Sequence, residues 1–396
     1  MTTANAVLSD FSQAEVKERA ARAQAIMKSK GWGQLLIIDE GGAGVRYLAG
    51  LSHVKPPSPA FMVLPESGDP VLLASWGMMA AGINQLEKHT YVKVKPIMGR
   101  GFLGDVPGAI AEALTDAGYK GGPLAVDGLP LLRDGLVASL KSKFPDISFV
   151  NAARTTEVIR LQKSAAEEAN YRRAAVQSYN GMEVFMAVIQ PGVRNDEAVQ
   201  EATHVSVMQG AEENLLIHGA GTPWVWGRGS RGDKTFVDGD LVTVELNARF
   251  HGYYAQVCRS WIIGKVDPAK QKLIDDTKRA LDVMYKVARP GMTGKEIFHA
   301  ADDEAKKLGR QFCDVRWGHG VGLTIGECYD FADWDREAGG PCDTPIPVGS
   351  HGNFHPFFII PGPNGRGAYN ALWGDPWVMG AHGVELLVDP PRALEP

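Results

Sequence analysis

Six short apolar runs of strand length within the first 152 residues limit the folds available to this chain. Helical periodicity precedes the first run, over 16–31, and separates the later runs, over 106–118 and 129–144. Helices that alternate with short strands are typical of a compact α/β domain. The six runs are LLIID (35–39), AFMVLP (60–65), PVLLAS (70–75), YVKVKPI (91–97), PLAVD (123–127) and ISFVNA (147–152).

The second part of the chain has a different pattern. Two β-rich runs, 240–250 and 253–264, are joined through His251 and Gly252, which predicts a hairpin. Gly- and aromatic-rich, strand-like sequence follows further helical segments. We therefore predict an α+β protein, with an N-terminal α/β domain over 1–154 and a second domain over 155–396. The helical segments of the second domain cover 155–190, 196–209, 268–288 and 294–308.

Composition narrows the class of protein. The chain has 396 residues, which at roughly 150 residues per domain predicts two domains. Its 41 basic and 46 acidic side chains give a formal charge of −5, so nothing in the charge favours nucleic acid as a partner. The sequence has no run of 18 apolar residues, which argues against a membrane span, and the cytoplasm is the expected location. Four cysteines without a C-x-x-C pair predict free thiols.

Polar residues gather in four stretches that are otherwise typical of buried strands. One is the hairpin, and the others are RWGHGVGLTIGE (316–327), GSHGNFHPF (349–357) and GAHGVELLV (380–388). Five of the ten histidines lie in these stretches. Imidazoles transfer protons near neutral pH, so such crowding favours acid–base chemistry over packing. The five are His251, His319, His351, His355 and His382.

These stretches resemble the pita-bread fold shared by creatinase, aminopeptidase P, prolidase and methionine aminopeptidase. GHGVGLTIGE is similar to the family's GHGIGLxxHE, and VELNARFHGYYAQVCRSW is similar to VDxGxxxxGYxSDxTRT. The segment IRLQKSAAEEANYRRAA leads into the second domain as it does in the family. The first 150 residues resemble the N-terminal domain of creatinase and prolidase. The resemblance implies a creatinase-like α/β domain followed by a pita-bread catalytic domain.

The resemblance also implies a set of metal ligands, from which this chain departs. Family metallopeptidases hold two divalent ions with two Asp, one His and two Glu. The corresponding positions here carry Glu245, Gln256, His319, His355 and a residue at His382 or Gly383. Because a dinuclear site needs hard bridging oxygens, we expect that the two-metal peptidase centre is lost and that no cofactor is needed. The alternative is a single divalent ion on Glu245, His319 and His355.

Creatinase itself is matched incompletely. The two carboxylates that the resemblance assigns to a bound guanidinium fall on Cys258 and His355, and neither side chain balances a cation. The histidine that activates water in creatinase falls on Arg228. These departures argue against the hydrolysis of creatine by this chain.

The residue types favour a metal-independent lyase as the leading hypothesis. A histidine would remove a proton from a hydroxyl or a carbon, an elimination or retro-aldol step would release a small fragment, and Glu245 or another histidine would return the proton. Aromatic walls would suit an aromatic or phenolic small molecule. The candidate catalytic residues are His319, His355, His382, Glu245 and Gln256. The candidate substrate-binding residues are Trp224, Trp226, Arg228, Tyr253, Tyr254, Cys258, Arg259, Trp317, Glu327 and Tyr329.

Two other functions remain open. The first is a creatinase-like hydrolase of a C–N bond in a small amide or amidine, in which His355 or His382 activates water. The second is a non-catalytic pita-bread binding module, which the clustered histidines and the balanced charge disfavour. The resemblance to creatinase further implies a homodimer in which the N-terminal domain reaches the partner's site, with His53 and Lys55 as the contributing residues.

Overall fold

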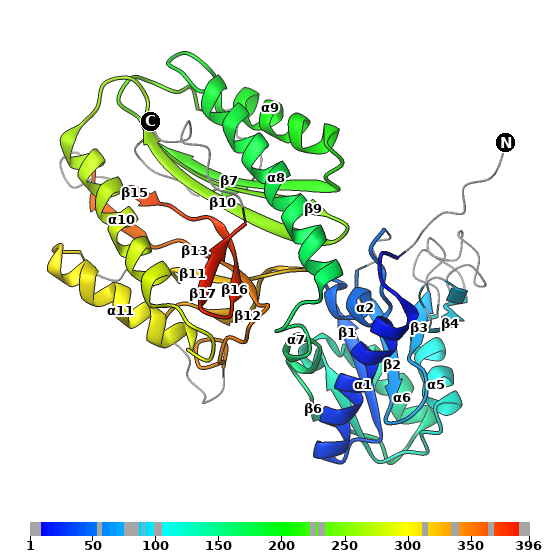
Figure 1. Cartoon of the computed structure of the whole chain (residues 1–396). Helices are drawn as coiled ribbons and strands as arrows, with labels where there is room; N and C mark the ends of the chain where they lie inside the picture. Colours follow the sequence, from blue (N-terminus) through cyan, green and yellow to red (C-terminus); the bar gives the residue numbers. More distant parts are fainter. Residues whose placement is uncertain are drawn as a thin grey trace. The chain divides into compact units, whose positions relative to one another are not determined.

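The computed structural model divides the chain into two compact units, Met1–Arg160 and Leu161–Pro396 (Figure 1). The predicted α+β class is confirmed, since both units combine helices with β-sheet. The residues described are 9–53, 58–74, 87–88, 90, 92–98, 105–221, 227–228 (backbone only), 234–310, 316–333, 340–362 and 368–387.

The first unit is built on a six-stranded mixed sheet in the order β4-β3-β2-β1-β5-β6. Strand β1 pairs antiparallel with β2 on one side and parallel with β5 on the other. The sheet therefore changes from antiparallel to parallel pairing at β1. All six predicted strands are present. They are β1 (Gln34–Asp39), β2 (Ala60–Pro65), β3 (Val71–Ala74), β4 (Lys93–Pro96), β5 (Pro123–Asp127) and β6 (Ser148–Asn151). The helices are α1 (Gln13–Lys30), α2 (Ala43–Leu48), α5 (Val106–Asp116), α6 (Asp134–Lys143) and α7 (Thr155–Val158), with a 3-10 turn at Leu129–Leu131.

The boundary between the units lies six residues beyond the predicted one, because α7 packs with the first unit. Asp127, at the end of β5, accepts hydrogen bonds from the backbone N–H and the hydroxyl of Thr156, both at 2.8 Å. The hydroxyl of Tyr47 donates to the carbonyl of Ile159 at 3.0 Å. These bonds fix 155–160 to the first unit.

The predicted long helix over 155–190 is interrupted between α7 and α8 (Ala165–Val188). Ser164 caps α8 in a reciprocal capping box with Glu167, which starts a new helix at that point. The preceding residue, Lys163, is held by a bond from its N–H to the carbonyl of Gly349 and by a buried ion pair with Glu327. Tertiary contacts of Lys163 therefore end the helical continuity that the sequence pattern predicts.

The second unit contains two main sheets with helices packed against them (Figure 1). The four-stranded sheet has the order β10-β9-β7-β8 and the five-stranded sheet the order β12-β11-β13-β16-β17, while β14 and β15 form a separate pair. The strands are β7 (Glu213–Ala220), β8 (Gly227–Arg228), β9 (Leu241–Phe250), β10 (Tyr253–Ile262), β11 (Gly318–Val321), β12 (Ile325–Asp330), β13 (His351–Phe354), β14 (Phe357–Pro361), β15 (Ala368–Leu372), β16 (Pro376–Gly380) and β17 (Gly383–Leu386). The remaining helices are α9 (Asn195–Met208), α10 (Pro268–Val287) and α11 (Gly294–Lys307).

The predicted hairpin is confirmed as β9 and β10, which pair in register along ten residues each. Both turn residues, His251 and Gly252, have positive φ values of 45° and 92°, as a tight two-residue turn requires. Alternation along β9 separates two faces. Val242, Val244 and Leu246 pack in a core against α8 and α9. The polar residues between them therefore face the other side of the sheet.

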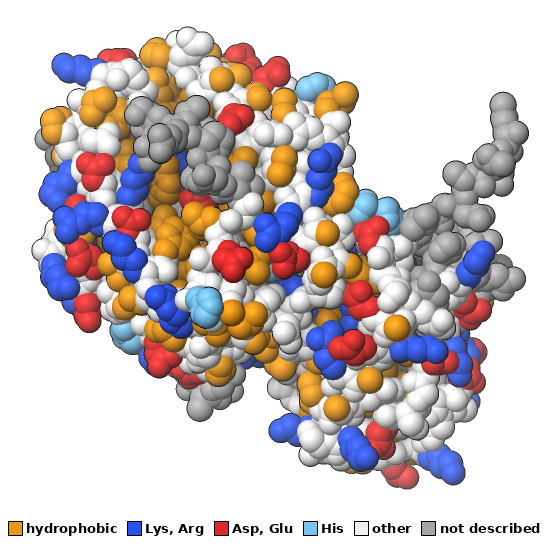
Figure 2. All heavy atoms as spheres, viewed as in Figure 1, with side chains coloured by type: hydrophobic (Ala, Val, Ile, Leu, Met, Phe, Trp, Pro, Cys, Tyr) orange, Lys and Arg blue, Asp and Glu red, His pale blue; other side chains and the backbone are white. Residues whose placement is uncertain are grey.

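Surface features add little to the functional question. On the face that Figure 2 shows, acidic and basic side chains are interspersed over both units. None of the helices among the described residues is long and apolar enough to cross a membrane.

A buried ion pair fixes the segment before β16 against β10. Arg259 and Asp375 lie 2.6 Å apart, with side chains 1% and 6% exposed. Arg259 also donates to the carbonyls of Cys258 and Gly374, at 2.8 and 3.0 Å. Tyr179 of α8 donates its hydroxyl to Asp375 at 2.5 Å. The two charges are thus enclosed and paired with each other.

Replacing Arg259 by methionine should lower the free energy of unfolding by about 3–5 kcal/mol, because Asp375 would be left buried without its partner charge. Urea denaturation followed by circular dichroism measures this loss. The matched control is Arg194→Met, which breaks the ion pair between Arg194, 51% exposed, and Asp196 and should cost far less. Equal losses in the two variants would contradict the role given to the buried pair.

A second enclosed titratable group is His351, at the start of β13. Its ring stacks on Tyr171 of α8, with ring centroids 4.3 Å apart and planes at 10°. Neither ring nitrogen has a hydrogen-bond partner among the described residues. Burial, followed by the charges of Lys163 and Arg172, lowers the pKa of His351 well below its usual value. The folded protein therefore keeps this imidazole neutral.

Acid should destabilise the protein in part through His351. Below pH 6.5 the unfolded chain binds a proton at this histidine that the folded chain does not bind, so stability falls as the pH falls. Between pH 7 and pH 5 the wild type should lose about 2 kcal/mol more than His351→Phe, which keeps the stacking ring but does not titrate. Urea denaturation at the two pH values measures the difference. An identical pH dependence in both proteins would refute the assignment.

Candidate active site

The hairpin presents a row of polar side chains on the face turned away from α8 and α9. Glu245 on β9 and Cys258 on β10 are directly opposite each other in the register, and Gln256 is two residues from Cys258 on the same face. Glu245 is 9% exposed, and Gln256 and Cys258 are completely buried. Burial and the neighbouring Glu245 carboxylate raise the pKa of the Cys258 thiol well above its usual value, so Cys258 stays protonated.

The second sheet supplies the histidines. His319 on β11 pairs with Asn353 on β13, and the pairing continues to a bond from the N–H of His355 to the carbonyl of Trp317 at 3.0 Å. The rings of His319 and His355 meet edge to face, with centroids 5.1 Å apart. His319 is 2% and His355 5% exposed. Two of the three imidazoles that the sequence predicts as catalytic therefore lie together.

Asn353 and Gly374 join the two sheets at this point. The side-chain amide of Asn353 donates to the backbone carbonyl of Gln256 at 2.6 Å. The same nitrogen, Nδ2, lies 3.9 Å from the sulfur of Cys258. Gly374 and Cys258 exchange two backbone hydrogen bonds, at 2.9 and 3.1 Å. A Cβ on Gly374 would stand 2.3 Å from the carbonyl oxygen of Phe354, so the close approach requires glycine. The hairpin, His319 and His355 thus form one polar cluster.

Both imidazoles of the cluster are neutral. The Nδ1–H of His319 donates to the carbonyl of Gly320 at 3.0 Å, which leaves its Nε2 as a proton acceptor. Burial, then the charges of Arg316 and His355, lower the pKa of His319 well below its usual value. Burial and Arg316 lower the pKa of His355 to about 3. Both rings are therefore uncharged at neutral pH, where a free ring nitrogen can accept a hydrogen bond from water or from a ligand.

Three side chains of the cluster keep polar atoms without a hydrogen-bond partner among the described residues. These atoms are both amide atoms of Gln256, the amide oxygen of Asn353 and Nε2 of His355. Buried polar groups in folded proteins are normally paired, so a concentration of such atoms marks a place where a ligand or water is bound. This cluster is therefore the candidate active site.

Several predicted site residues lie elsewhere in their own unit. His382 is exposed in the turn between β16 and β17, between the paired residues Gly380 and Gly383. The structure therefore does not place His382 beside His319 and His355. Arg259 is held in its ion pair with Asp375. Glu327 is held by Lys163 at 2.6 Å, and both side chains are 2% exposed.

The predicted aromatic residues that the structure describes have structural contacts. The hydroxyl of Tyr253 donates to Glu167 of α8 at 3.1 Å, and that of Tyr254 donates to Glu213. Trp317 packs edge to face against neighbouring rings, and the hydroxyl of Tyr329 donates to the carbonyl of His351 at 3.5 Å. His53 pairs with Asp10 at 2.9 Å within the first unit. Trp224, Trp226, Lys55 and the side chain of Arg228 lie outside the described residues.

Sequence reasoning missed Asn353 and Gly374. Asn353 lies two residues before His355, so strand alternation places its side chain on the same face, and this signal was available in GSHGNFHPF. Gly374 has no such signal, because only the pairing with Cys258 brings it to the cluster.

The residues present do not fit the family's two-ion centre. The resemblance places Gln256 and His355 at two positions where family peptidases have carboxylates, and an amide and an imidazole do not supply the hard bridging oxygens of a dinuclear site. For a single ion, Glu245, His319 and His355 offer suitable atoms. Among the described residues, however, the ligand atoms of these three do not all lie within 4.8 Å of one another.

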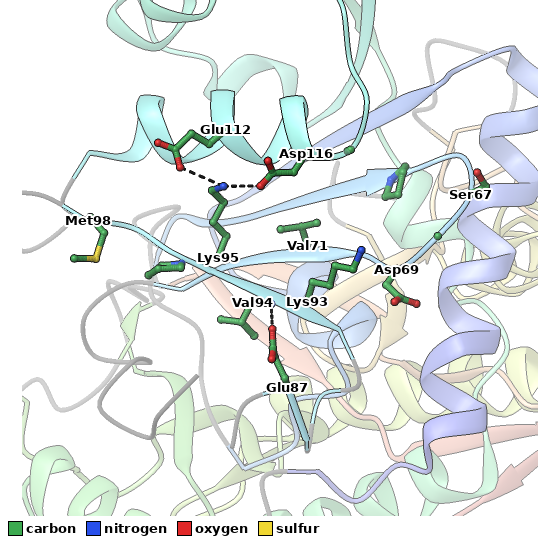
Figure 3. Close-up of a pocket in the computed structure, with 14 residues that line it drawn as sticks. Ser67, Asp69, Val71, Glu87, Lys93, Val94, Lys95, Met98, Glu112 and Asp116 are labelled. Atoms are coloured by element: carbon green, nitrogen blue, oxygen red, sulfur yellow. Dashed lines mark hydrogen bonds and ion pairs between the residues drawn. The ribbon is translucent and has the colours of Figure 1, made fainter. Parts of the chain in front are cut away.

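A hollow of about 580 Å³ lies in the first unit between β3, β4 and α5 (Figure 3). Its charges are largely paired. Lys95 lies 2.6 Å from Asp116 and 3.2 Å from Glu112, and the outward N–H of Val94 donates to Glu87 at 3.0 Å. Glu87 thereby covers the exposed edge of β4. None of the predicted site residues lines this hollow.

Comparison with known sequences finds peptidases. The chain is 27% identical over 197 residues to the uncharacterized peptidase YqhT of Bacillus subtilis, a match that covers 49% of this chain and 56% of the relative. It is 25% identical over 204 residues to the Xaa-Pro dipeptidase of Pyrococcus furiosus, covering 51% of this chain and 59% of the relative. The chain thus spans little more than half the length of these curated relatives.

Comparison with solved structures extends the likeness in fold to both units. The prolidase of Pyrococcus horikoshii superposes with a TM-score of 0.79 at 19% identity, covering 95% of this chain and 99% of the other. The dipeptidase PepE of Mycobacterium ulcerans gives 0.77 at 23%, covering 96% and 97%. The N-terminal domain of a FACT complex subunit from chickpea gives 0.71 at 12%, covering 96% and 97%. At these identities the likeness shows the fold alone.

The lyase hypothesis is wrong. The relatives are peptidases, and peptidases are hydrolases, so the comparisons favour the hydrolase alternative and give no support to elimination chemistry or to an aromatic substrate. Residue types did not distinguish the two reactions, because hydrolysis and elimination both use imidazoles and carboxylates as proton carriers.

The expectation that no cofactor is needed is also wrong, as is the exclusion of peptidase chemistry. A sequence model of metallopeptidase family M24 matches residues 169–380, which is more than half of the chain and includes Glu245, Gln256, His319 and His355. A metal bound here would have ligands different from the family's five. The predicted relationship to creatinase, aminopeptidase P and prolidase is confirmed, and the chain belongs to metallopeptidase family M24.

Proposed function

We propose that this protein hydrolyses a carbon–nitrogen bond of a small amide or amidine. The observation that carries the proposal is the pair of enclosed, neutral imidazoles, His319 and His355, beside the amide groups of Gln256 and Asn353. Membership in a peptidase family supports the same class of bond, since peptidases cleave C–N bonds. The relatives named as Xaa-Pro dipeptidases supply the first probes.

The geometry supports a division of roles for an amide substrate. Nε2 of His355 accepts a hydrogen bond from water, whose oxygen attacks the carbonyl carbon. The side-chain N–H of Gln256 donates to the carbonyl oxygen as negative charge develops there. The C–N bond then breaks, a proton of the attacking water passes to the leaving nitrogen, and the products are a carboxylic acid and an amine. His319, whose tautomer Gly320 fixes, packs against His355 and limits the positions its ring can take.

We also propose that the protein acts as a homodimer to which His53 contributes. The support is the resemblance to creatinase together with the position of His53 on the first unit, where its ring is 29% exposed beside Asp10. Lys55, the second predicted contributor, lies outside the described residues. Sedimentation measures the assembly state directly.

Hydrolysis should incorporate one oxygen atom from water into the acid product at each turnover. Purified protein of measured metal content is incubated in ¹⁸O-labelled water with Xaa-Pro dipeptides, N-terminal methionyl peptides, small aliphatic amides and amidines. Mass spectrometry of the products then reports the label. Turnover of any of these compounds without incorporation of ¹⁸O would refute hydrolysis.

Removal of either imidazole should lower kcat/KM by about 100-fold, because His355 positions the attacking water and His319 positions the ring of His355. The variants are His355→Ala and His319→Ala, assayed on whichever probe shows turnover. His382→Ala is the matched control, since His382 is exposed in the turn after β16 and should keep full activity. A loss in His382→Ala equal to that in His355→Ala would overturn the assignment of roles.

A further inference from the structure

The amide groups of Gln256 and Asn353 offer a defined pattern of donors and acceptors. Nδ2 of Asn353 must face the backbone carbonyl of Gln256, to which it donates at 2.6 Å. The side-chain oxygen Oδ1 of Asn353 is therefore the atom left to accept a hydrogen bond. Gln256 contributes one N–H₂ group and one oxygen, neither with a partner among the described residues. Both side chains are completely buried. The cluster therefore offers a donor group and two amide acceptors in a region shielded from solvent.

Strand pairing fixes this pattern beside the imidazoles. Asn353 is paired with His319 in the β11–β13 register and is two residues from His355. The bond from Asn353 to the carbonyl of Gln256 ties β13 to β10. Close contact of Gly374 with Asn353 and His355 limits movement on that side, because a Cβ at Gly374 would lie 2.4 Å from Oδ1 of Asn353. The amides are thus rigid elements of the site rather than mobile surface groups.

A ligand that satisfies this pattern must both donate and accept. A carboxylate only accepts, and it would face the oxygens of Gln256 and Asn353 and the carboxylate of Glu245. An amidinium only donates, so the N–H₂ of Gln256 would stay unpaired. A carboxamide or ureido group has one oxygen that accepts and N–H groups that donate, and it can pair with a side-chain amide through two hydrogen bonds.

We propose that the substrate presents a neutral carboxamide or ureido group to Gln256 and Asn353. This inference rests on the proposed hydrolysis of a C–N bond and narrows its substrate class from amides and amidines to neutral amides.

The test measures binding separately from turnover. Four probes share one aliphatic chain and differ in the end group: butyramide, butylurea, butyramidine and butyrate. Titration calorimetry uses the His355→Ala protein, which keeps Gln256 and Asn353 and does not consume the probes. The two neutral probes should bind at least ten-fold more tightly than the two charged ones. Equal affinities, tighter binding of butyramidine or butyrate, or no binding of any probe would overturn the inference.

Two further variants, made in the His355→Ala protein, test whether Gln256 recognises the end group of the probe. Gln256→Glu keeps the shape, replaces the donor by an acceptor and adds a charge, so it should reverse the preference from butyramide to butyramidine. Gln256→Met removes both polar atoms and should abolish the preference for butyramide. Circular dichroism confirms folding of each variant. A uniform change for all four probes would show that Gln256 has only a structural role.

The outcomes separate this inference from the proposed function. Preference for neutral probes without incorporation of ¹⁸O by the wild type would refute hydrolysis and leave the recognition of amides standing. Incorporation of ¹⁸O from water into the product of an amidine, together with tighter binding of butyramidine, would confirm hydrolysis. The same result would refute the inference that the substrate is neutral.

Discussion

The pairing between Cys258 and Gly374 is the constraint on which the candidate site depends. Two backbone hydrogen bonds join the central hairpin to the segment before β16, and the buried pair of Arg259 and Asp375 holds them in place. Together with the bond from Asn353 to the backbone carbonyl of Gln256, this junction brings Gln256, Asn353 and His355 to one place. Gly374 is required because the backbones approach too closely for any side chain.

The junction also explains the electrostatics of the cluster. It encloses the imidazoles between two sheets, and enclosure is the first cause of their lowered pKa values. Other charges of the second unit are paired locally, as in Arg259 with Asp375 and Lys163 with Glu327. The proposed chemistry therefore depends on neutral groups: imidazoles that position the attacking water and amides that recognise the substrate.

Membership in family M24 and the residues of the cluster have to be considered together. The family assignment establishes the scaffold and makes hydrolysis the expected reaction, which corrects a hypothesis built on residue types alone. The scaffold does not determine the ligands at its centre, and here the resemblance places an amide, Gln256, and an imidazole, His355, where family peptidases have carboxylates. Substrate and cofactor are therefore questions for this chain's own residues.

The sequence by itself determined the strands of the first unit and the central hairpin, and it grouped His319 and His355 with His382, which the structure places elsewhere. Alternation of apolar residues and glycine positions are local signals, and the family motifs add the order of the elements. Only the tertiary structure decided that Arg259 and Glu327 are ion-pair partners, that His382 lies exposed and that Gly374 reaches the cluster. Those outcomes depend on contacts between residues far apart in the chain, such as Cys258 with Gly374 and Lys163 with Glu327. The local pattern of a sequence does not indicate which distant residues will pair.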